Sequence, residues 1–435
     1  MISKPFSSAR FVLTDPQQTQ AQMLYWTNQY SICSFLETAV AHDLDSSSVS
    51  DRASDLPLHF TSTNMVAAAG ISPFHAPTSD LSVLDQWVGA QENWIFGHLG
   101  FPHPQVAPDP EAFGPAFFYV PETVLELQGN VLHVHSYQDP HLIWAAIQET
   151  VVPPLQDLPQ ANFQPLMSRE EYLLRLEKIL DHIHRGDCYE INFCQYFQAL
   201  AKVDTLQVYR HLVNASPNPF SAYYKKENAY LCCASPERFL QKKGDTLFSQ
   251  PIKGTAPRDL NNATQDQVLQ KALGESAKEK RENVMVVDLV RNDMSRVCQP
   301  GSVEVSELFG LYRFPQVHQM ISTIQGKVLA GVLPSQIFGA CFPMGSMTGA
   351  PKAKVLDLIA TYENAPRGLY SGAVGYFTPS GDFDFNVVIR SLFYNAETQT
   401  LRYGVGSGIT AASSPPSEYE ECLLKAAAIR ALWAH

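Results

Sequence analysis

The chain has 435 residues, of which 45% are hydrophobic and 17% charged, a composition typical of a folded globular protein. Its formal charge of −12, with no offsetting basic cluster, argues against a nucleic-acid partner, and no apolar run is long enough to span a membrane. The eight cysteines form no CxxC pair and the N-terminus lacks a signal-peptide pattern, so we expect buried thiols in a cytoplasmic protein.

Residues 1–165 contain short apolar segments separated by proline-rich loops. Ser31–Glu37 and Trp94–Gly97 have the character of strands. Strands of this length, separated by turns, favour antiparallel sheets over a series of βαβ units.

A helix is expected after Ser168, which forms a capping box with Glu171, and Gly186 ends it. The strand expected over residues 187–193 places Glu190 and Asn192 on one face. Those polar side chains face either solvent or a cleft, and a single strand does not distinguish the two.

A hairpin is expected around the turn at residues 242–245. It brings Glu237, which follows Ser235-Pro236, towards the same end as Lys253 in the stretch Pro251-Ile252-Lys253-Gly254-Thr255. A carboxyl group beside a lysine is either an acid and a nucleophile or a salt bridge.

Three glycine-bearing segments follow a charged helix that carries Glu282. Residues 342–352 lack the Gly-Lys-Ser/Thr order of a phosphate loop, but successive backbone N–H groups before a helix can seat an anion. Residues 368–392 predict a hairpin whose second strand carries Arg390, and residues 404–409 predict a glycine-rich turn. Three such segments together favour an anion site over simple turns.

The last helix is expected over Ser417–His435, with Glu418, Glu421 and Lys425 on one face. Glu421 and Lys425 could form a surface ion pair. Alternatively, Glu418 and Glu421 are two carboxylate ligands of Mg²⁺.

Six ordered segments between Ser168 and Ala431 form one pattern: Gly186-Asp187-Cys188-Tyr189, Ser235-Pro236-Glu237, Pro251–Thr255, Glu282–Asp293, Gly349-Ala350-Pro351-Lys352 and Glu418-Tyr419-Glu420-Glu421. Together they resemble the chorismate-utilising enzymes, which include the anthranilate, aminodeoxychorismate and isochorismate synthases. The resemblance implies their α/β (α+β) fold, with two interleaved halves whose large antiparallel sheets form a sandwich flanked by helices. Residues 1–165 would be an N-terminal region of the same sandwich, and residues 166–435 the chorismate-binding catalytic region.

The resemblance also implies roles for single residues. Glu282, Glu418 and Glu421 would hold Mg²⁺, and Glu237 would be the general acid for loss of the C4 hydroxyl of chorismate. The expected substrate-binding residues are Thr255, Thr348, Gly349, Tyr370, Arg390, Gly406, Gly408 and Lys425.

Lys253 is similar to the lysine of the aminodeoxychorismate synthase branch, where anthranilate synthases carry alanine. There the lysine attacks C2 as the C4 hydroxyl leaves, and ammonia then adds at C4 and expels it. Anthranilate synthases typically have His after the first metal-binding Glu, and this chain has Asn283, which implies a product that keeps its enolpyruvyl group.

Glu190 departs from the family pattern, since amine-adding members usually have Gln there and water-adding members Lys. As the nucleophile-selecting residue it would steer ammonium or act as a weak base. The chain has no Gly-x-Cys-x-Gly elbow, so ammonia is expected from a separate glutamine amidotransferase subunit. One alternative is anthranilate synthase component I, which Lys253 and Asn283 disfavour. The other is a catalytically silent, chorismate-binding regulatory subunit, which is disfavoured because the proposed catalytic and metal-binding residues are all present.

Overall fold

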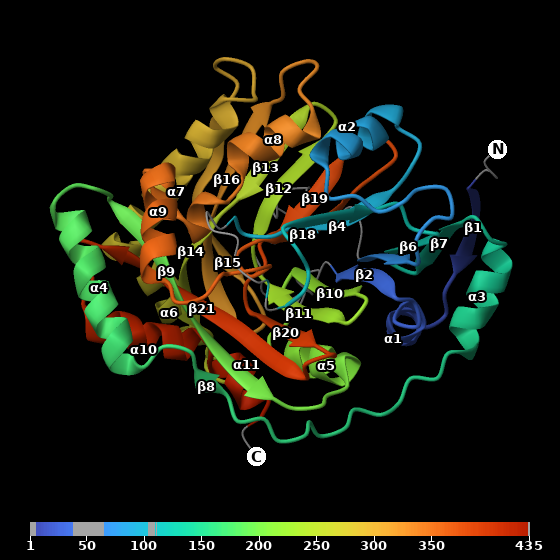
Figure 1. Cartoon of the computed structure of the whole chain (residues 1–435), viewed down its shortest axis with the longest axis horizontal. Coiled ribbons are helices and arrows are strands. Elements are labelled where there is room, and N and C mark those ends of the chain that lie inside the picture. The colour runs from blue at the N-terminus through green and yellow to red at the C-terminus, as the bar shows by residue number, and fades with distance from the viewer. Residues whose placement is uncertain (1–5, 38–64, 103–108, 110, 434–435) are drawn as a thin grey trace.

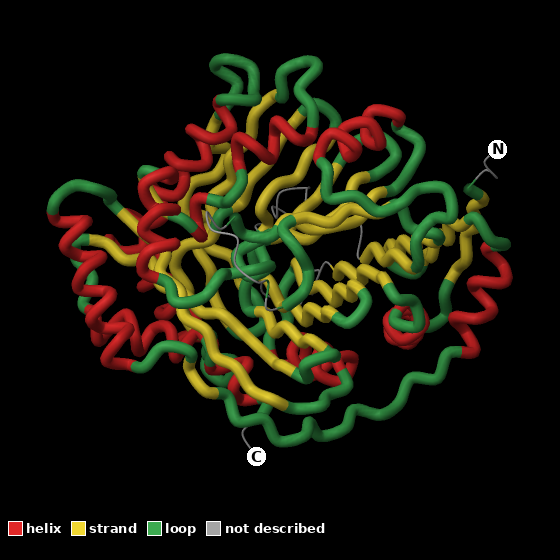
Figure 2. Tube along the Cα trace, viewed as in Figure 1, coloured by secondary structure: helices red, strands yellow, loops and turns green. Residues whose placement is uncertain are grey.

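The computed structural model describes residues 6–37, 65–102, 109 and 111–433. Within this part of the chain, two large antiparallel sheets pack together and helices cover their outer faces (Figures 1 and 2). The expected sandwich of antiparallel sheets flanked by helices is therefore confirmed.

The larger sheet has 12 strands among the described residues, and long-range pairings join its N-terminal and C-terminal parts. Across the sheet the strands are β1 (Ser7–Val12), β7 (Val131–Ser136), β6 (Thr123–Gln128), β3 (Met65–Ala69), β2 (Ile32–Glu37), β10 (Phe220–Lys226), β11 (Ala229–Ser235), β20 (Ser391–Asn395), β21 (Thr400–Thr410), β9 (Glu190–Leu200) and β17 (Gly349–Ala350), with β8 (Gln164–Pro165) paired to β9.

The smaller sheet has nine strands in the described part of the chain, and it too combines strands from both sides of residue 165. In order they are β14 (Ile252–Pro257), β16 (Val317–Lys327), β13 (Thr246–Gln250), β12 (Arg238–Lys243), β19 (Phe383–Asn386), β18 (Ala373–Phe377), β4 (Ile95–Leu99) and β5 (Ala116–Tyr119), with β15 (Glu304–Arg313) paired to β16.

The helices lie around the rim and over the outer faces in Figure 1. On the right side are α3 (Pro140–Glu149), at the edge, and α1 (Pro16–Thr27), further in; α2 (Leu81–Ala90) and α8 (Pro334–Cys341) lie at the top and α7 (Ala277–Ser295) at the upper left. The others are α4 (Arg169–His184), α5 (Thr205–Ala215), α6 (Ala263–Glu275), α9 (Lys352–Tyr362), α10 (Pro415–Lys425), α11 (Ala427–Ala431) and the 3₁₀ turn η3 (Gly345–Met347).

Two hydrophobic cores fix the orientation of β9. Ile191 and Phe193 belong to a core shared with α4 and α10, whereas Cys194 and Tyr196 belong to one that contains residues of both sheets. Since side chains alternate along a strand, Glu190 and Asn192 lie on the side of Cys194 and Tyr196. They are 5% and 8% exposed, so this face is turned towards the protein interior and not towards solvent.

Two sequence predictions about local structure are wrong. Residues 404–409 lie within strand β21 and do not form a turn, because their glycines let neighbouring side chains pack against a flat backbone. The last helix is divided, since the amide of Ala426 bonds to both Cys422 O and Leu424 O and ends α10.

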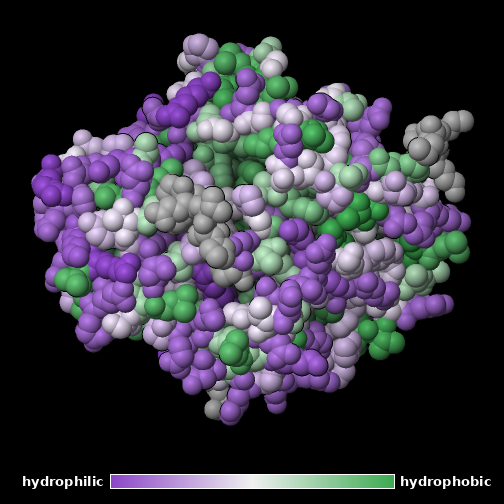
Figure 3. Space-filling model, in the orientation of Figure 1, coloured by the Kyte–Doolittle hydropathy of each residue, from purple (hydrophilic) through white to green (hydrophobic). Residues whose placement is uncertain are grey.

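The predicted second strand of the hairpin after residue 368 is shorter than expected. It ends at Asn386 as β19, and Arg390 lies beyond it with φ of +50°. All eight cysteines are free and buried, as predicted. Among the described residues, no helix combines the length and apolar character needed to cross a membrane. In Figure 3 the visible face is mostly hydrophilic, with hydrophobic residues scattered or set into a hollow near its centre.

Candidate active site

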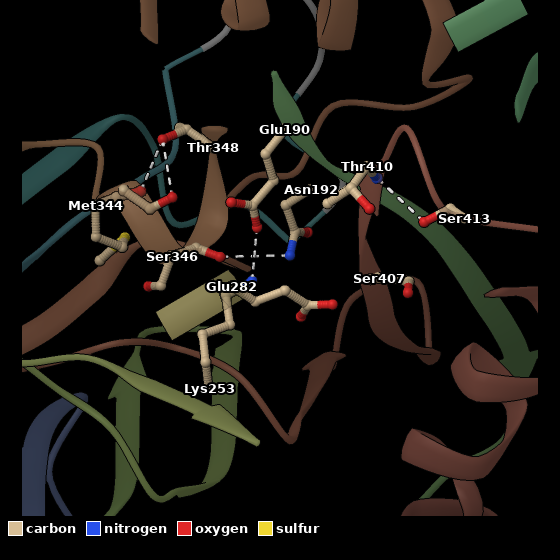
Figure 4. A network of polar contacts seen from close by, with 12 residues as sticks. Glu190, Asn192, Lys253, Glu282, Met344, Ser346, Thr348, Ser407, Thr410 and Ser413 are labelled. Carbon is tan, nitrogen blue, oxygen red and sulfur yellow. Dashed lines mark hydrogen bonds and ion pairs between the residues drawn. The ribbon is translucent and has the colours of Figure 1, made fainter. Parts of the chain in front are cut away.

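Residues from distant parts of the chain meet around Lys253 (Figure 4). Its Nζ donates a hydrogen bond of 2.9 Å to Oε1 of Glu190, and the two side chains are only 12% and 6% exposed. Burial acts to lower the pKa of Lys253, but the negative charges of Glu190, Glu282 and Glu237 outweigh it and raise the pKa above its ordinary value. In the absence of substrate, Lys253 is therefore a cation held by Glu190.

Gly408 on β21 makes this ion pair possible. A Cβ atom there would lie 3.0 Å from Oε1 of Glu190 and 3.0 Å from Nζ of Lys253. Any larger side chain would push into the contact, so the glycine is explained by close packing and not by turning of the chain.

Glu237 lies in the corner where the chain passes from β11 in one sheet to β12 in the other. Its Oε1 accepts a hydrogen bond of 2.6 Å from the hydroxyl of Ser346. Burial raises the pKa of Glu237 to about 7, against the hydrogen bond from Ser346 and the positive charges of Lys253 and Arg390. A carboxyl group with this pKa carries a proton in much of the population near neutral pH, as a general acid requires.

Ser346 was not singled out by sequence reasoning. It belongs to the glycine-bearing segment 342–352, which drew attention for its backbone N–H groups, whereas its hydroxyl contacts a residue 109 positions away. The same segment carries Thr348, whose hydroxyl bonds back to Met344 O at 2.9 Å and whose carbonyl accepts from Asn192 N at 2.7 Å. The segment is thus tied to β9.

Gly349 lets the 342–352 segment approach β9 closely. Its φ is +140°, and a Cβ atom there would lie 2.0 Å from the carbonyl oxygen of Glu190. Both features exclude other residues. The segment therefore sits directly against the strand that carries Glu190.

The remaining predicted substrate-binding residues lie on several elements. Arg390 is close enough for its charge to lower the pKa of Glu237. Tyr370 is 3% exposed and packs edge-on against Tyr196. Thr255 is exposed on β14. Gly406 is on β21, and its carbonyl accepts a 3.0 Å hydrogen bond from Nζ of Lys425.

The three predicted metal ligands come from two helices, Glu282 from α7 and Glu418 and Glu421 from α10. The hydroxyl of Ser407 bonds to Glu418 and lies 3.4 Å from Oε1 of Glu421. The ammonium group of Lys278 lies 3.8 Å from Glu282 and 3.9 Å from Glu421. The ammonium group of Lys278 therefore lies between a carboxylate of α7 and a carboxylate of α10.

Two of these carboxylates differ in their ionisation. Burial raises the pKa of Glu282 to about 7, with Glu279 adding to the rise and Lys253 and Lys278 opposing it. Burial also acts to raise the pKa of Glu421. The positive charge of Lys425, whose Nζ is 2.8 Å away, is the foremost of the effects that outweigh burial and lower this pKa below its ordinary value.

Among the described residues, no three His, Cys, Asp or Glu side chains are clustered tightly enough to form a preassembled metal site. The donor set nevertheless fits a hard divalent cation, because all three candidate ligands are carboxylates and two of them already face the ammonium of Lys278. Sequence reasoning did not identify Lys278, whose i,i+4 spacing to Glu282 was the available signal.

Asn283 follows Glu282 but contacts a different part of the molecule. Its Oδ1 accepts a 2.6 Å hydrogen bond from Ser322 of β16, between α7 and the sheet. It is 1% exposed. Its amide therefore packs within the helix–sheet interface.

Residues 40–431 match the family model described as chorismate binding enzyme. The chain is 34% identical over 376 residues to aminodeoxychorismate synthase component 1 of Salmonella typhimurium, covering 84% of this chain and 80% of the relative. It is 38% identical to the protein of the same name from Klebsiella aerogenes, covering 68% of this chain and 66% of that relative. The match to the chloroplastic aminodeoxychorismate synthase of Arabidopsis thaliana is 40% identical and covers 61% of this chain but 29% of that protein. The chain thus spans less than two thirds of the latter two relatives.

Solved structures share the fold. The menaquinone-specific isochorismate synthase of Escherichia coli superimposes with a TM-score of 0.77 at 18% identity, covering 99% of this chain and 95% of that one. Anthranilate synthase component I of Streptococcus pneumoniae superimposes with a TM-score of 0.68 at 21% identity, covering 98% and 92%. By its sequence match over most of its length, the chain belongs to the family of chorismate binding enzymes.

Proposed function

We propose that the chain is component I of aminodeoxychorismate synthase, which converts chorismate and ammonia to 4-amino-4-deoxychorismate, a precursor of p-aminobenzoate and folate. The observation that carries the proposal is the buried Lys253, held 2.9 Å from Glu190 and close to the acid Glu237. The names of the Salmonella and Klebsiella relatives support it. Residues 166–435 carry the chemistry in this proposal, and residues 1–165 complete the sandwich.

The first half of the reaction uses Lys253 as a nucleophile. Lys253 passes a proton to Glu190, and the neutral amine attacks C2 of chorismate. Both ring double bonds shift, C1=C2 to C1=C6 and C5=C6 to C4=C5, and the C4–O bond breaks. Glu237 protonates the departing hydroxyl, which leaves as water. Nζ is then a secondary ammonium bonded to C2, and Glu237 is a carboxylate. The covalent step divides one difficult displacement into two easier ones.

The second half replaces the lysine with ammonia. Ammonia attacks C4, both ring double bonds shift back to C1=C2 and C5=C6, and the electron pair of the C2–N bond returns to Nζ, which leaves as a neutral amine. Lys253 then regains its proton from Glu190, and Glu237 is protonated again from solvent. The enolpyruvyl group is untouched throughout.

Binding of the substrate is assigned to the basic and backbone groups around the lysine. Arg390 and Lys425 supply the positive charge that the chain lacks overall, and Mg²⁺ held by Glu282, Glu418 and Glu421 would neutralise the ring carboxylate of chorismate. The other proposed contacts are Thr255, Thr348, Gly349, Tyr370, Gly406 and Gly408.

Ammonia is assigned to a partner, because the chain has no Gly-x-Cys-x-Gly elbow for a glutaminase nucleophile of that kind. We propose a separate glutamine amidotransferase subunit, and the words "component 1" in the names of the relatives support a second component. Added ammonium salt should replace that partner in vitro.

Product identification tests the proposal. The purified chain is incubated with chorismate, Mg²⁺ and an ammonium salt in mildly alkaline buffer, and the products are separated by chromatography with mass detection. Aminodeoxychorismate without anthranilate is the expected result. Anthranilate as the main product would favour the anthranilate synthase alternative, and no turnover with bound chorismate would favour a silent regulatory subunit.

A further inference from the structure

Gln319 on β16 is a buried polar side chain that makes no hydrogen bond to the described part of the chain. It is 0% exposed, and neither its Oε1 nor its Nε2 has a hydrogen-bond partner among the residues that the structure describes. A buried amide that makes no hydrogen bond is destabilising, and native proteins retain few such groups. Gln319 therefore needs an explanation other than stability.

The strand geometry shows which way Gln319 points. Side chains alternate along β16, and His318 and Ser322 face the helices, since His318 lies 2.8 Å from Asp266 of α6 and Ser322 bonds to Asn283 of α7. Gln319 lies between them in the alternation, so it projects from the opposite face of the sheet.

That opposite face is turned towards the larger sheet. Thr323, on the same side as Gln319, accepts a 3.3 Å hydrogen bond from Gln250. Gln250 in turn bonds to Arg238 at 2.7 Å, and the guanidinium of Arg238 lies 4.8 Å from the ring centre of Phe220 on β10. Gln319 is therefore directed into the space between the two sheets.

The pairing of β16 with β14 places Gln319 beside the proposed nucleophile. Gln319 is directly opposite Thr255, and Ile321 is opposite Ile252, so Lys253 lies in the short stretch between these pairs. The lysine reaches across to Glu190 on β9 of the larger sheet. The same stretch of sheet thus carries the lysine and the unpartnered amide.

We propose that Gln319 is a further substrate-binding residue, whose Nε2–H group donates a hydrogen bond to a carboxylate oxygen of chorismate. The inference rests on the proposed function, because it takes chorismate as the molecule bound beside Lys253. An uncharged amide adds a directional donor to the charges of Arg390 and Lys425. The substrate would then satisfy a group that the fold leaves unsatisfied.

Gln195 on β9 offers a matched control. It too is 0% exposed, with both amide atoms unpartnered among the described residues. It lies on the same face of β9 as Ile191 and Phe193, however, and pairs with Val405 of the same core, so it faces away from the site.

The experiment compares Gln319→Met with Gln195→Met, in each case measuring the Kd for chorismate by calorimetry in the presence of Mg²⁺ and the Tm by thermal unfolding. Methionine has a similar length but no amide, so Gln319→Met should keep or raise the Tm while weakening chorismate binding about tenfold. Gln195→Met should keep or raise the Tm with an unchanged Kd. If Gln319 acted only in folding, its replacement would change the Tm and leave the Kd for chorismate unchanged.

A Gln319→Met protein that binds chorismate as tightly as the wild type would overturn the inference. If the methionine variant does not fold, Gln319→Glu decides, because it preserves the shape and places a negative charge against the carboxylate. That variant should bind more than tenfold more weakly than the wild type, and equal binding would again overturn the inference. Wild-type protein that binds no chorismate would instead overturn the proposed function, and the inference with it.

Discussion

Two buried acidic clusters lie on opposite faces of the smaller sheet, and they are built differently. On the helix side, Asp266 accepts hydrogen bonds from Arg258 at 3.0 Å, from the backbone of Asp259 at 3.0 Å and from His318 at 2.8 Å. Burial acts to raise the pKa of Asp266, but the hydrogen bonds from Arg258 and His318 outweigh it and lower the pKa to about 2. On the inner side, burial raises the pKa of Glu237 to about 7.

The difference separates a structural cluster from a site prepared for a ligand. Asp266 has enough donors to remain ionised, so its charge stabilises the fold. Around Lys253, three carboxylates share few donors, and Gln319 has no partner among the described residues. Groups that the protein leaves incompletely satisfied are available to bind and to exchange protons with a substrate.

The largest expected effect comes from Lys253→Ala. Loss of the nucleophile should lower the rate of aminodeoxychorismate formation by about 10³-fold or more. The change also leaves Glu190 buried without its ion-pair partner, so the variant should have a lower Tm than the wild type, and the Tm is measured beside the rate. Lys253→Arg is the matched control, since it keeps the positive charge but does not deprotonate, and it should be equally inactive. Product is measured by mass detection, and full activity of either variant would exclude the covalent step.

Glu237→Gln should lower kcat by about 10²- to 10³-fold, because the amide cannot protonate the departing hydroxyl. The acid acts in its protonated form, which predominates below its pKa of about 7, so the contribution of Glu237 declines as the pH rises through that value. A profile of kcat against pH should show this limb in the wild type and lack it in the variant. Ser346→Ala, which removes a hydrogen bond that lowers this pKa, should move the limb to higher pH; an unmoved limb would assign it to another group.

Asp266→Asn should change stability and leave the chemistry alone. The pKa of Asp266 is lowered from 3.8 to about 2, which corresponds to about 2 kcal/mol of folding free energy. Because the folded pKa is depressed, this stability is present above pH 3.8 and is lost as the pH falls towards 2. Urea unfolding across pH should show the loss in the wild type and a flatter curve in the variant, with unchanged kcat at neutral pH. A large fall in kcat would show that the helix-side cluster acts in catalysis.

Glu190→Gln should have the smallest effect. It removes the foremost negative charge that raises the pKa of Lys253, so that pKa should fall and the lysine should react at lower pH. The maximal rate should change only a few-fold, since solvent can accept the proton in place of Glu190. Single-turnover rates of covalent adduct formation, followed by intact mass against pH, provide the measurement. An unchanged pH profile would mean that Glu190 does not govern the ionisation of Lys253.

Local chemistry in the sequence was enough to predict several elements. The N-cap at Ser168, whose hydroxyl accepts from the amide of Glu171, begins α4, and Gly186 follows the end of the helix with φ of +82°. The expected capping box is present only in this half, because the carboxylate of Glu171 pairs with Arg175. The turn at residues 242–245 joins β12 to β13 as expected. These features depend on residues close together in the chain, so the sequence contains nearly all the information that they need.

The identities of the reactive side chains follow from the amino-acid sequence, and its resemblance to known chorismate-utilising enzymes indicated the sandwich fold that the structure confirms. The environments of those side chains arise only from tertiary packing. Glu190 reaches Lys253 across 63 positions, and the strand character of residues 404–409 depends on side chains that pack against their glycines. The lack of partners for Gln319 among the described residues and the raised pKa of Glu237 are likewise invisible in the sequence, because burial and neighbouring charges arise only when distant segments pack together.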